Sequence, residues 1–153
     1  MKTLTITGTP GTGKTLLAKK LAKRHGYAYV DVNALIAKHK LHERYDRKLK
    51  TKIINQKKLA KFLVTLISHI RATNAKGVVI DSHLSHHLPP SLVDVCYVTA
   101  CSLPVLKQRL KKRGYSSRKI RDNLEAEAFQ SCLIEAQELG HKIIVKDTSN
   151  QKW

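Results

Sequence analysis

The stretch that decides the fold is the glycine-rich segment Gly8-Thr9-Pro10-Gly11-Thr12-Gly13-Lys14-Thr15. It follows the β-branched run at residues 4–7 and leads into the Leu-, Ala- and Lys-rich residues 16–22. Strand, glycine-rich turn and helix form the context that the G-x-x-x-x-G-K-[ST] pattern of a P-loop requires. A turn that merely joins a strand to a helix does not demand four fixed identities in eight positions. We therefore expect a site for a nucleoside triphosphate.

The chemistry of a triphosphate explains these residue types. Several backbone N–H groups must point inward, and glycine tolerates the dihedrals and close approach that this needs. The first turn of the next helix adds N–H groups and the positive end of its dipole. Lys14 is expected to reach the β- and γ-phosphates, and the Thr15 hydroxyl to contact Mg²⁺. The candidate ATP-binding residues in this segment are Gly8, Pro10, Gly11, Thr12, Gly13, Lys14, Thr15 and Leu16.

Length and composition indicate one globular domain over residues 1–153, with 42% hydrophobic and 26% charged residues. No apolar run approaches the ~20 residues of a membrane span. A strand that enters the P-loop directly leaves no room for a signal peptide, so we expect a cytoplasmic protein. The three cysteines lack CxxC spacing and are expected to be buried thiols rather than a redox or metal site.

The charge is strongly positive, with 29 Lys and Arg against 11 Asp and Glu, a net charge of +18. A nucleotide site needs only a few cations. The excess suits contact with a polyanion such as rRNA, although a lineage with a generally basic proteome would show it too.

Strand and helix patterns alternate along the chain, which predicts right-handed βαβ units and a five-stranded parallel sheet with helices on both faces. The charged segment 38–52 has few core anchors and is expected to be mobile or ordered by ligand. A four-residue apolar repeat predicts one helix from Ser116 to Gly140. The other expected helices cover residues 14–24, 31–37, 55–73 and 102–112, and the other strands residues 27–30, 78–81, 93–100 and 142–146.

An acidic residue ends the apolar strand at residues 78–81, which suggests a second ligand for the metal ion. Asp81 would hold Mg²⁺ opposite Thr15, although a helix-capping or ion-paired carboxylate is the alternative. His83, beside it, could orient a water molecule or a phosphate. His86 and His87 follow, but without an acidic or Cys neighbour in the sequence we expect an exposed loop cluster rather than a zinc site.

Two arginines lie one helical turn apart before a Gly-Tyr break. Arg109 and Arg113 could form a solvated basic face, as such residues commonly do. Alternatively they belong to a hinged flap over the phosphates, where guanidinium groups stabilise the charge of a transferring phosphoryl group. The candidate catalytic residues are Lys14, Asp81, His83, Arg109 and Arg113.

With these residues in hand, the chain resembles the atypical adenylate kinase isoenzyme 6 (CINAP-type) family in its archaeal form. The resemblance rests on the P-loop, on the D-x-H step Asp81-Ser82-His83, on Arg113-Gly114-Tyr115-Ser116, and on residues 119–127, which are similar to the family's K-I-x-x-N-x-x-x-E helix. It covers residues 3–148. The P-loop occurs in many families, whereas the D-x-H and R-G-Y motifs in this order are specific to this family.

The resemblance implies a P-loop nucleoside monophosphate kinase fold with an NMP-binding insert at about 31–54 and a short LID at about 112–122. It implies transfer of the γ-phosphoryl group from ATP to AMP with Mg²⁺, a slow ATPase activity involving His83, and a monomer. It further implies a role in late maturation of the small ribosomal subunit, through a platform protein of the S-eleven family and pre-rRNA. Asp147 and Thr148 fall in the expected adenine loop, and Asp31, Lys38, Tyr45 and Asp46 are the candidate acceptor contacts.

The insert departs from the family pattern. Where relatives read like Y-D-E-E-Y-D, this chain has Tyr45-Asp46 and then the basic residues 47–52. The acceptor base therefore stays open. Three functions remain: an adenylate kinase with ATPase activity, an ATP-driven ribosome-assembly switch with incidental kinase turnover, and a kinase for another small acceptor.

Overall fold

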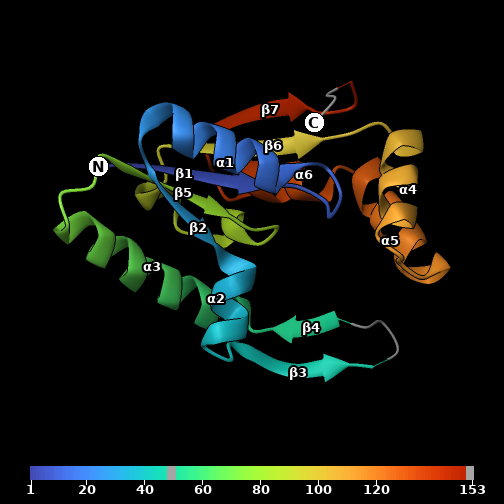
Figure 1. The fold of residues 1–153 in the computed structure, drawn as a ribbon, viewed down its shortest axis with the longest axis horizontal. Coiled ribbons are helices and arrows are strands. Elements are labelled where there is room, and N and C mark those ends of the chain that lie inside the picture. The colour runs from blue at the N-terminus through green and yellow to red at the C-terminus, as the bar shows by residue number, and fades with distance from the viewer. Residues whose placement is uncertain (48–50, 151–153) are drawn as a thin grey trace.

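Five parallel strands form the central sheet of the computed structural model, which describes residues 1–47 and 51–150. Their order is β2-β5-β1-β6-β7, and all four pairings are parallel, as predicted (Figure 1). The strands are β1 (Lys2–Thr7), β2 (Ala28–Asp31), β5 (Gly77–Asp81), β6 (Val95–Ala100) and β7 (Ile143–Asp147).

Helices cover both faces of this sheet. On one face, α1 (Lys14–His25) packs its Leu17, Ala18 and Ala22 against β1 and β5. On the other, α3 (Gln56–Ala72) and α6 (Ser131–Glu138) share a core with β2, β5 and β6. The shorter elements are α2 (Val32–Lys38), the 3₁₀ turns η1 (Ser85–His87) and η2 (Pro90–Leu92), α4 (Leu103–Lys112) and α5 (Ser117–Ala128).

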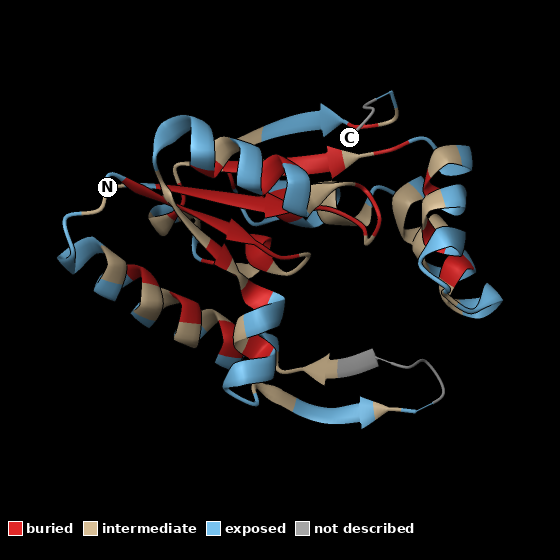
Figure 2. Ribbon diagram, viewed as in Figure 1, coloured by how far each residue is buried: buried red, intermediate tan, exposed pale blue. Residues whose placement is uncertain are grey.

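Burial follows the hydrophobic pattern of the sequence. The middle strands β1 and β5 are almost wholly buried, while α1 turns an exposed face outward (Figure 2). Helix α3 buries Leu59, Leu63 and Ile67, the stripe that its i, i+4 spacing predicts. Among the helices in the described part of the chain, none has the length and apolar character needed to cross a membrane.

The charged segment after α2 forms a β-hairpin. Strands β3 (His42–Asp46) and β4 (Thr51–Ile54) pair antiparallel beside α2, away from the central sheet (Figure 1). The predicted scarcity of core anchors is confirmed on β3, where Glu43, Arg44 and Tyr45 are exposed. The hairpin itself was not predicted, because its charged residues carry no apolar alternation. Lys48, Leu49 and Lys50 lie outside the described residues.

The single helix predicted from Ser116 to Gly140 is wrong. The chain bends between α5 and α6, and Gln130 takes the left-handed conformation (φ 53°). The two helices serve different cores: Ile120 and Leu124 of α5 pack with α4, whereas Ala136 of α6 packs on the sheet. A continuous helix could not reach both, and neither Gly nor Pro marks the break.

Candidate active site

A cleft of about 690 Å³ brings together residues from four parts of the chain. Its walls are the P-loop and first turns of α1, the start of α2, the segment after β5, and the end of α4 with the start of α5. The strands β1, β6 and β7 point their carboxyl ends toward α4 and α5 (Figure 1). The lining residues are Pro10, Gly11, Gly13, Lys14, Thr15, Leu16, Lys19, Asn33, Asp81, Ser82, His83, Arg109, Lys112, Arg113, Tyr115 and Lys119.

The P-loop is held against the end of β6. Gly8 has φ 137°, and a Cβ on it would lie 2.4 Å from the hydroxyl of Thr99, so another side chain does not fit without movement. The hydroxyls of Thr12 and Thr99 are 2.6 Å apart, and Thr99 donates to the carbonyl of Thr7. The buried side chain of Thr12 thus holds the loop in shape rather than facing the cleft. Residues 14–16 form the first turn of α1, where N–H groups have no partner within the helix.

The ammonium group of Lys14 lies inside this loop. Its Nζ donates to the carbonyl oxygens of Gly8 (2.8 Å) and Thr9 (3.0 Å). Burial lowers the pKa of Lys14 to about 8, and the nearby guanidinium of Arg113 acts in the same direction. Carbonyl oxygens are weak partners for a buried cation, so a phosphate group would be a better one.

Asp81 ends β5 in a buried position, 4% exposed, in the same cleft as Thr15. The phenol of Tyr29 donates to Asp81 Oδ2 at 2.9 Å. The parallel register of β2 on β5 brings them together, with Tyr29 opposite Val79 and Asp31 opposite Asp81. Burial and this carboxylate raise the pKa of Tyr29, so the phenol stays protonated as a donor. The hydroxyl of Thr15 and the carboxylate of Asp81 are oxygen ligands of the kind Mg²⁺ prefers.

His83 is held in a tightly bonded turn after Asp81. The Ser85 hydroxyl donates to the carbonyl of Ile6, and the Thr7 hydroxyl to the carbonyl of His83. Burial, with a further contribution from the charge of Lys14, lowers the pKa of His83 to about 4. The imidazole is therefore neutral at neutral pH, and its unprotonated ring nitrogen can accept a hydrogen bond.

Arg109 and Arg113 have different surroundings. Arg113 ends α4 and lines the cleft. Arg109 donates from Nη2 to the carbonyl of Thr148 (2.7 Å) and from Nη1 to its hydroxyl (3.1 Å). Its Nη1 also lies 3.5 Å from the carbonyl of Gly11. Arg109 thus links α4, the P-loop and the segment after β7.

Thr148 completes that link from the other side. It is 1% exposed, and its hydroxyl donates to the carbonyl of Thr12 (2.8 Å). Its N–H donates to the carbonyl of Ala100 (2.9 Å). In this arrangement the side chain of Thr148 is used to join segments.

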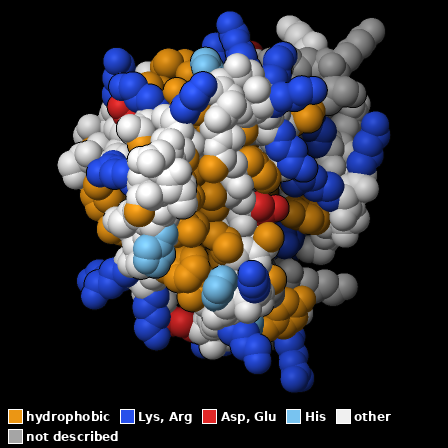
Figure 3. Space-filling model, turned by 60° about the vertical axis from the view of Figure 1, so that its left-hand side comes forward, with side chains coloured by type: hydrophobic (Ala, Val, Ile, Leu, Met, Phe, Trp, Pro, Cys, Tyr) orange, Lys and Arg blue, Asp and Glu red, His pale blue; other side chains and the backbone are white. Residues whose placement is uncertain are grey.

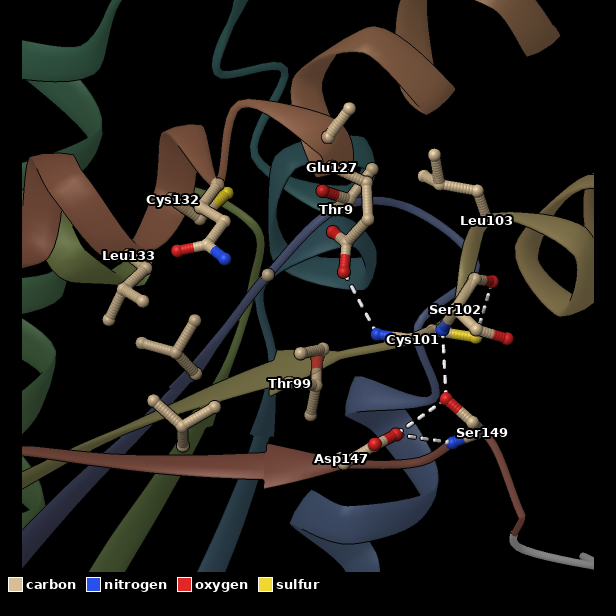
Figure 4. A pocket seen from close by; sticks show the side chains of 16 residues that line it. Thr9, Thr99, Cys101, Ser102, Leu103, Glu127, Cys132, Leu133, Asp147 and Ser149 are labelled. Atoms are coloured by element: carbon tan, nitrogen blue, oxygen red, sulfur yellow. Dashed lines mark hydrogen bonds between the residues drawn. The ribbon is translucent and has the colours of Figure 1, made fainter.

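A second cavity, of about 480 Å³, lies beside the P-loop among the ends of β6, β7, α5 and α6 (Figure 4). Gly8 and Thr9 line this cavity, whereas Pro10, Gly11 and Gly13 line the first. Asp147 lies here and accepts from the N–H and hydroxyl of Ser149, while Glu127 accepts from the N–H of Cys101. The structure therefore separates Asp147 from the cleft that contains Lys14.

The four candidate acceptor residues are not among those that line the Lys14 cleft in the described part of the chain. Asp31 caps α2 by accepting from the N–H of Ala34, and Lys38 ends that helix exposed. Tyr45, 52% exposed, and Asp46 lie on β3 of the hairpin. Within the cleft, α2 contributes Asn33 instead.

Sequence reasoning missed Tyr29, the hydrogen-bond partner of Asp81, and several residues that line the cleft. Tyr29 and Asn33 reach the site through strand order and helix direction, for which the sequence carries no local signal. Lys119, whose ammonium lies 4.3 Å from the ring centre of Tyr115, could have been noticed as a further cation in the stretch that carries the family resemblance.

The histidine cluster is not the exposed loop that we expected. His86 is 1% exposed, and its Nε2 lies 2.8 Å from an oxygen of Glu135 on α6. The expectation failed because it considered only acidic residues close in sequence, and folding brings Glu135 from 49 positions away.

Basic side chains also lie outside the cleft. Lys and Arg are spread round the face shown in Figure 3, where Asp and Glu are few. This follows from the net charge of +18.

Comparisons with known proteins show which family the chain is similar to. A family model described as "AAA domain" matches residues 4–130. The "Putative adenylate kinase" of Methanocaldococcus jannaschii is 34% identical over 148 residues, 97% of this chain and 77% of that protein. The "Adenylate kinase isoenzyme 6 homolog" of Caenorhabditis elegans is 31% identical over 146 residues, 95% of this chain and 78% of that protein.

Solved structures of kinases share the fold. A sugar kinase from Janibacter sp. superposes with a TM-score of 0.63 at 18% identity, covering 96% of this chain and 85% of that one. A deoxyadenosine kinase from M. mycoides does so with a TM-score of 0.54 at 17% identity, covering 95% and 90%. The sequence relatives, together with the P-loop and the D-x-H segment in one cleft, show that the chain belongs to the adenylate kinase isoenzyme 6 family of phosphotransferases.

Proposed function

We propose that the chain transfers the γ-phosphoryl group of ATP to AMP. The observation that carries this proposal is the single cleft shared by Lys14, Asp81 and Arg113, in a chain of this family. The N–H groups at the start of α1 bind the phosphate chain, and Lys14 exchanges the carbonyls of Gly8 and Thr9 for phosphate oxygens. Arg113 stabilises charge on the transferring group.

Thr15 and Asp81 would hold a magnesium ion in this cleft, and their oxygen donors fit that ion. The ion would neutralise charge on the phosphate oxygens. Tyr29 fixes one oxygen of Asp81 and so leaves the other to face a ligand. Acceptor AMP needs no protein base, because its phosphate is already a nucleophile and the protein supplies alignment.

The acceptor side of the proposal rests on α2 and the hairpin. Asn33 lines the cleft already, while Asp31, Lys38, Tyr45 and Asp46 are carried by the adjoining elements. We assign the insert at residues 31–54 to the acceptor and the LID to residues 112–122, within one domain of residues 1–153. Asp147 and Thr148 belong to the segment proposed to meet adenine.

ATP hydrolysis is the second proposed activity of the same site. A neutral His83 beside Lys14 is suited to orient an attacking water. With the charge of +18 and the family resemblance, this supports the alternative of an ATP-driven switch in small-subunit assembly, acting on a platform protein of the S-eleven type and pre-rRNA in the cytoplasm. In that alternative the chain acts as a monomer and kinase turnover is incidental.

The test is ADP formation from ATP and Mg²⁺, with and without AMP. The kinase proposal expects AMP-dependent formation of two ADP, lost in Lys14→Ala and Asp81→Asn and retained in Lys23→Ala, an exposed lysine on the same helix. AMP-independent hydrolysis without AMP consumption would overturn the kinase proposal in favour of the switch. If the protein phosphorylates another small acceptor in a screen but does not phosphorylate AMP, that acceptor would replace AMP as the proposed substrate.

A further inference from the structure

His86, His87 and Glu135 bring three potential metal-ligand atoms to one point between η1 and α6. One ring nitrogen of each imidazole and a carboxylate oxygen of Glu135 all lie within 4.8 Å of one another. The Glu135 oxygen is 2.8 Å from His86 Nε2 and 3.9 Å from His87 Nε2. In a tetrahedral zinc site, ligands at about 2.0–2.1 Å from the ion are roughly 3.3 Å apart. The two distances bracket that value, so small side-chain movements would suffice.

We propose that His86, His87 and Glu135 form a binding site for a zinc-class divalent transition ion, independent of the nucleotide site. Two imidazoles and one carboxylate are a ligand set that suits Zn²⁺, with water in the fourth position. Mg²⁺, which prefers oxygen ligands, does not suit this set.

The surroundings of His86 fit the metal-bound state. Its Nδ1 lies 2.7 Å from the Thr7 hydroxyl, which itself lies 3.2 Å from the carbonyl of His83. With an ion on Nε2, the ring proton resides on Nδ1 and donates to Thr7, whose own proton donates to His83. Each of these three hydrogen-bonding groups, the His86 Nδ1–H, the Thr7 hydroxyl and the His83 carbonyl, then has a partner. Such a bond to the far nitrogen is what orients metal-ligating imidazoles.

The site has both a rigid base and an opening to solvent. His86 is 1% exposed, and its carbonyl lies 2.7 Å from His141 Nε2, which holds η1 in place. The side chains of His87 and Glu135 are 23% and 49% exposed, which gives an ion a path inward. A bound ion would tie η1, just after Asp81 and His83, to α6.

The experiment uses the full chain after chelator treatment, with excess Mg²⁺ present to occupy the nucleotide site. Zn²⁺ alone is titrated against a competing indicator, and Co²⁺ is added separately for its visible spectrum. We expect one ion per chain, the absorption of tetrahedral Co²⁺, and a rise in Tm of roughly 5–10 °C when Zn²⁺ reaches about a hundredfold excess over Kd.

His87→Ala and Glu135→Gln are each expected to weaken Zn²⁺ binding at least tenfold and to remove the tetrahedral spectrum. His69→Ala, which removes an exposed histidine on α3, should bind as the wild type does. Unchanged affinity in both ligand variants, an equal loss in His69→Ala, or no Zn²⁺-dependent shift in the wild type would overturn the proposal. None of these readouts depends on phosphoryl transfer, so the kinase proposal is tested separately.

Discussion

Lys14 carries its charge in a partly buried position at the P-loop. Its ammonium lies between the carbonyls of Gly8 and Thr9, and burial lowers its pKa to about 8. Free protein above that pH therefore contains mostly neutral Lys14, which attracts a triphosphate less strongly.

We expect kcat/KM for ATP to fall about tenfold per pH unit above pH 8, because this parameter reports groups of the free enzyme. Saturating ATP should flatten the profile of kcat, since bound phosphate keeps Lys14 protonated. The measurement is steady-state kinetics across that range. Lys14→Arg is the control, because its guanidinium stays charged across this range. In this variant the fall of kcat/KM above pH 8 should disappear, even if its activity is low. A wild-type profile that stays flat well above pH 8 would contradict the assignment.

Tyr29 acts on Asp81 through a single hydrogen bond of 2.9 Å. Tyr29→Phe removes the hydroxyl and keeps the ring, so the carboxylate loses its orientation. We expect the Mg²⁺ concentration for half-maximal activity to rise about tenfold, with a smaller change in the rate at saturating Mg²⁺. Tyr27→Phe, two residues earlier in the chain, serves as the control. Equal Mg²⁺ dependence in the two variants would exclude an orienting role for Tyr29.

At the scale of elements, the segment after β7 is joined to the P-loop and β6 by one threonine. The hydroxyl of Thr148 donates to Thr12 and lies 3.1 Å from the carbonyl of Ala100. Arg109 of α4 bonds to the same residue. Three elements and the loop therefore meet at a side chain that is almost fully buried.

Thr148→Val keeps the volume and removes the hydroxyl, leaving buried acceptors without their donor. We expect the free energy of unfolding to fall by about 1–3 kcal/mol, measured by denaturant titration. Thr65→Val provides the matched control, because that hydroxyl bonds to a helix carbonyl in an exposed position. A loss as small as that of Thr65→Val would show that Thr148 is not needed for this connection.

Elements that carry a local signal could be predicted from the sequence. The P-loop, the five strands and the stripe of α3 follow from residue type and period, and all are present. The bend at Gln130 could not be predicted, because it is imposed by α5 and α6 packing on different cores. The hairpin after α2 was missed for a related reason: it buries little, so no alternation marks it.

The candidate site divides along the same line. Lys14, Thr15, Asp81, His83 and Arg113 were predicted from motifs, and the structure brings them into one cleft, although their roles stay predictions. Tyr29 with Asp81, Arg109 with Thr148 and Glu135 with His86 are contacts between distant segments. Such contacts depend on the order of the strands in the sheet and on where the helices pack. Neither can be read from the local patterns of a single sequence.

Across the whole molecule, histidines with lowered pKa values make stability depend on pH. The pKa of His83 is lowered to about 4 by burial and by Lys14, and burial also lowers those of His86 and His87, against the opposing charge of Glu135. Unfolding returns each to an ordinary pKa of about 6.5, so the unfolded chain binds more protons in this range. The stability that these three neutral histidines contribute is therefore fully present above about pH 6.5 and is lost as pH falls toward 4.

We expect the free energy of unfolding to decline steadily between pH 6.5 and about 4, measured by denaturant titration with chelator present. His83→Gln should flatten part of that slope, whereas His69→Gln, at an exposed position, should leave it unchanged. The lowered pKa of Asp94 adds to the slope only near its acid end, where the carboxyl of the unfolded chain begins to take up protons. Identical slopes in all three proteins would contradict the lowered pKa and neutral state of His83.

The alignment of β2 beside β5 has a consequence for protein engineers. Asp81 is oriented by a phenol from a neighbouring strand, at a register that only this strand order produces. Grafting the glycine-rich loop and its acidic partner onto a different scaffold would transplant the visible signature and leave the orienting donor behind. A functional graft would have to include both adjacent strands, β2 and β5, so that the hydrogen bond from Tyr29 to Asp81 is kept. The smallest unit that can be transferred is therefore a pair of strands rather than a sequence motif.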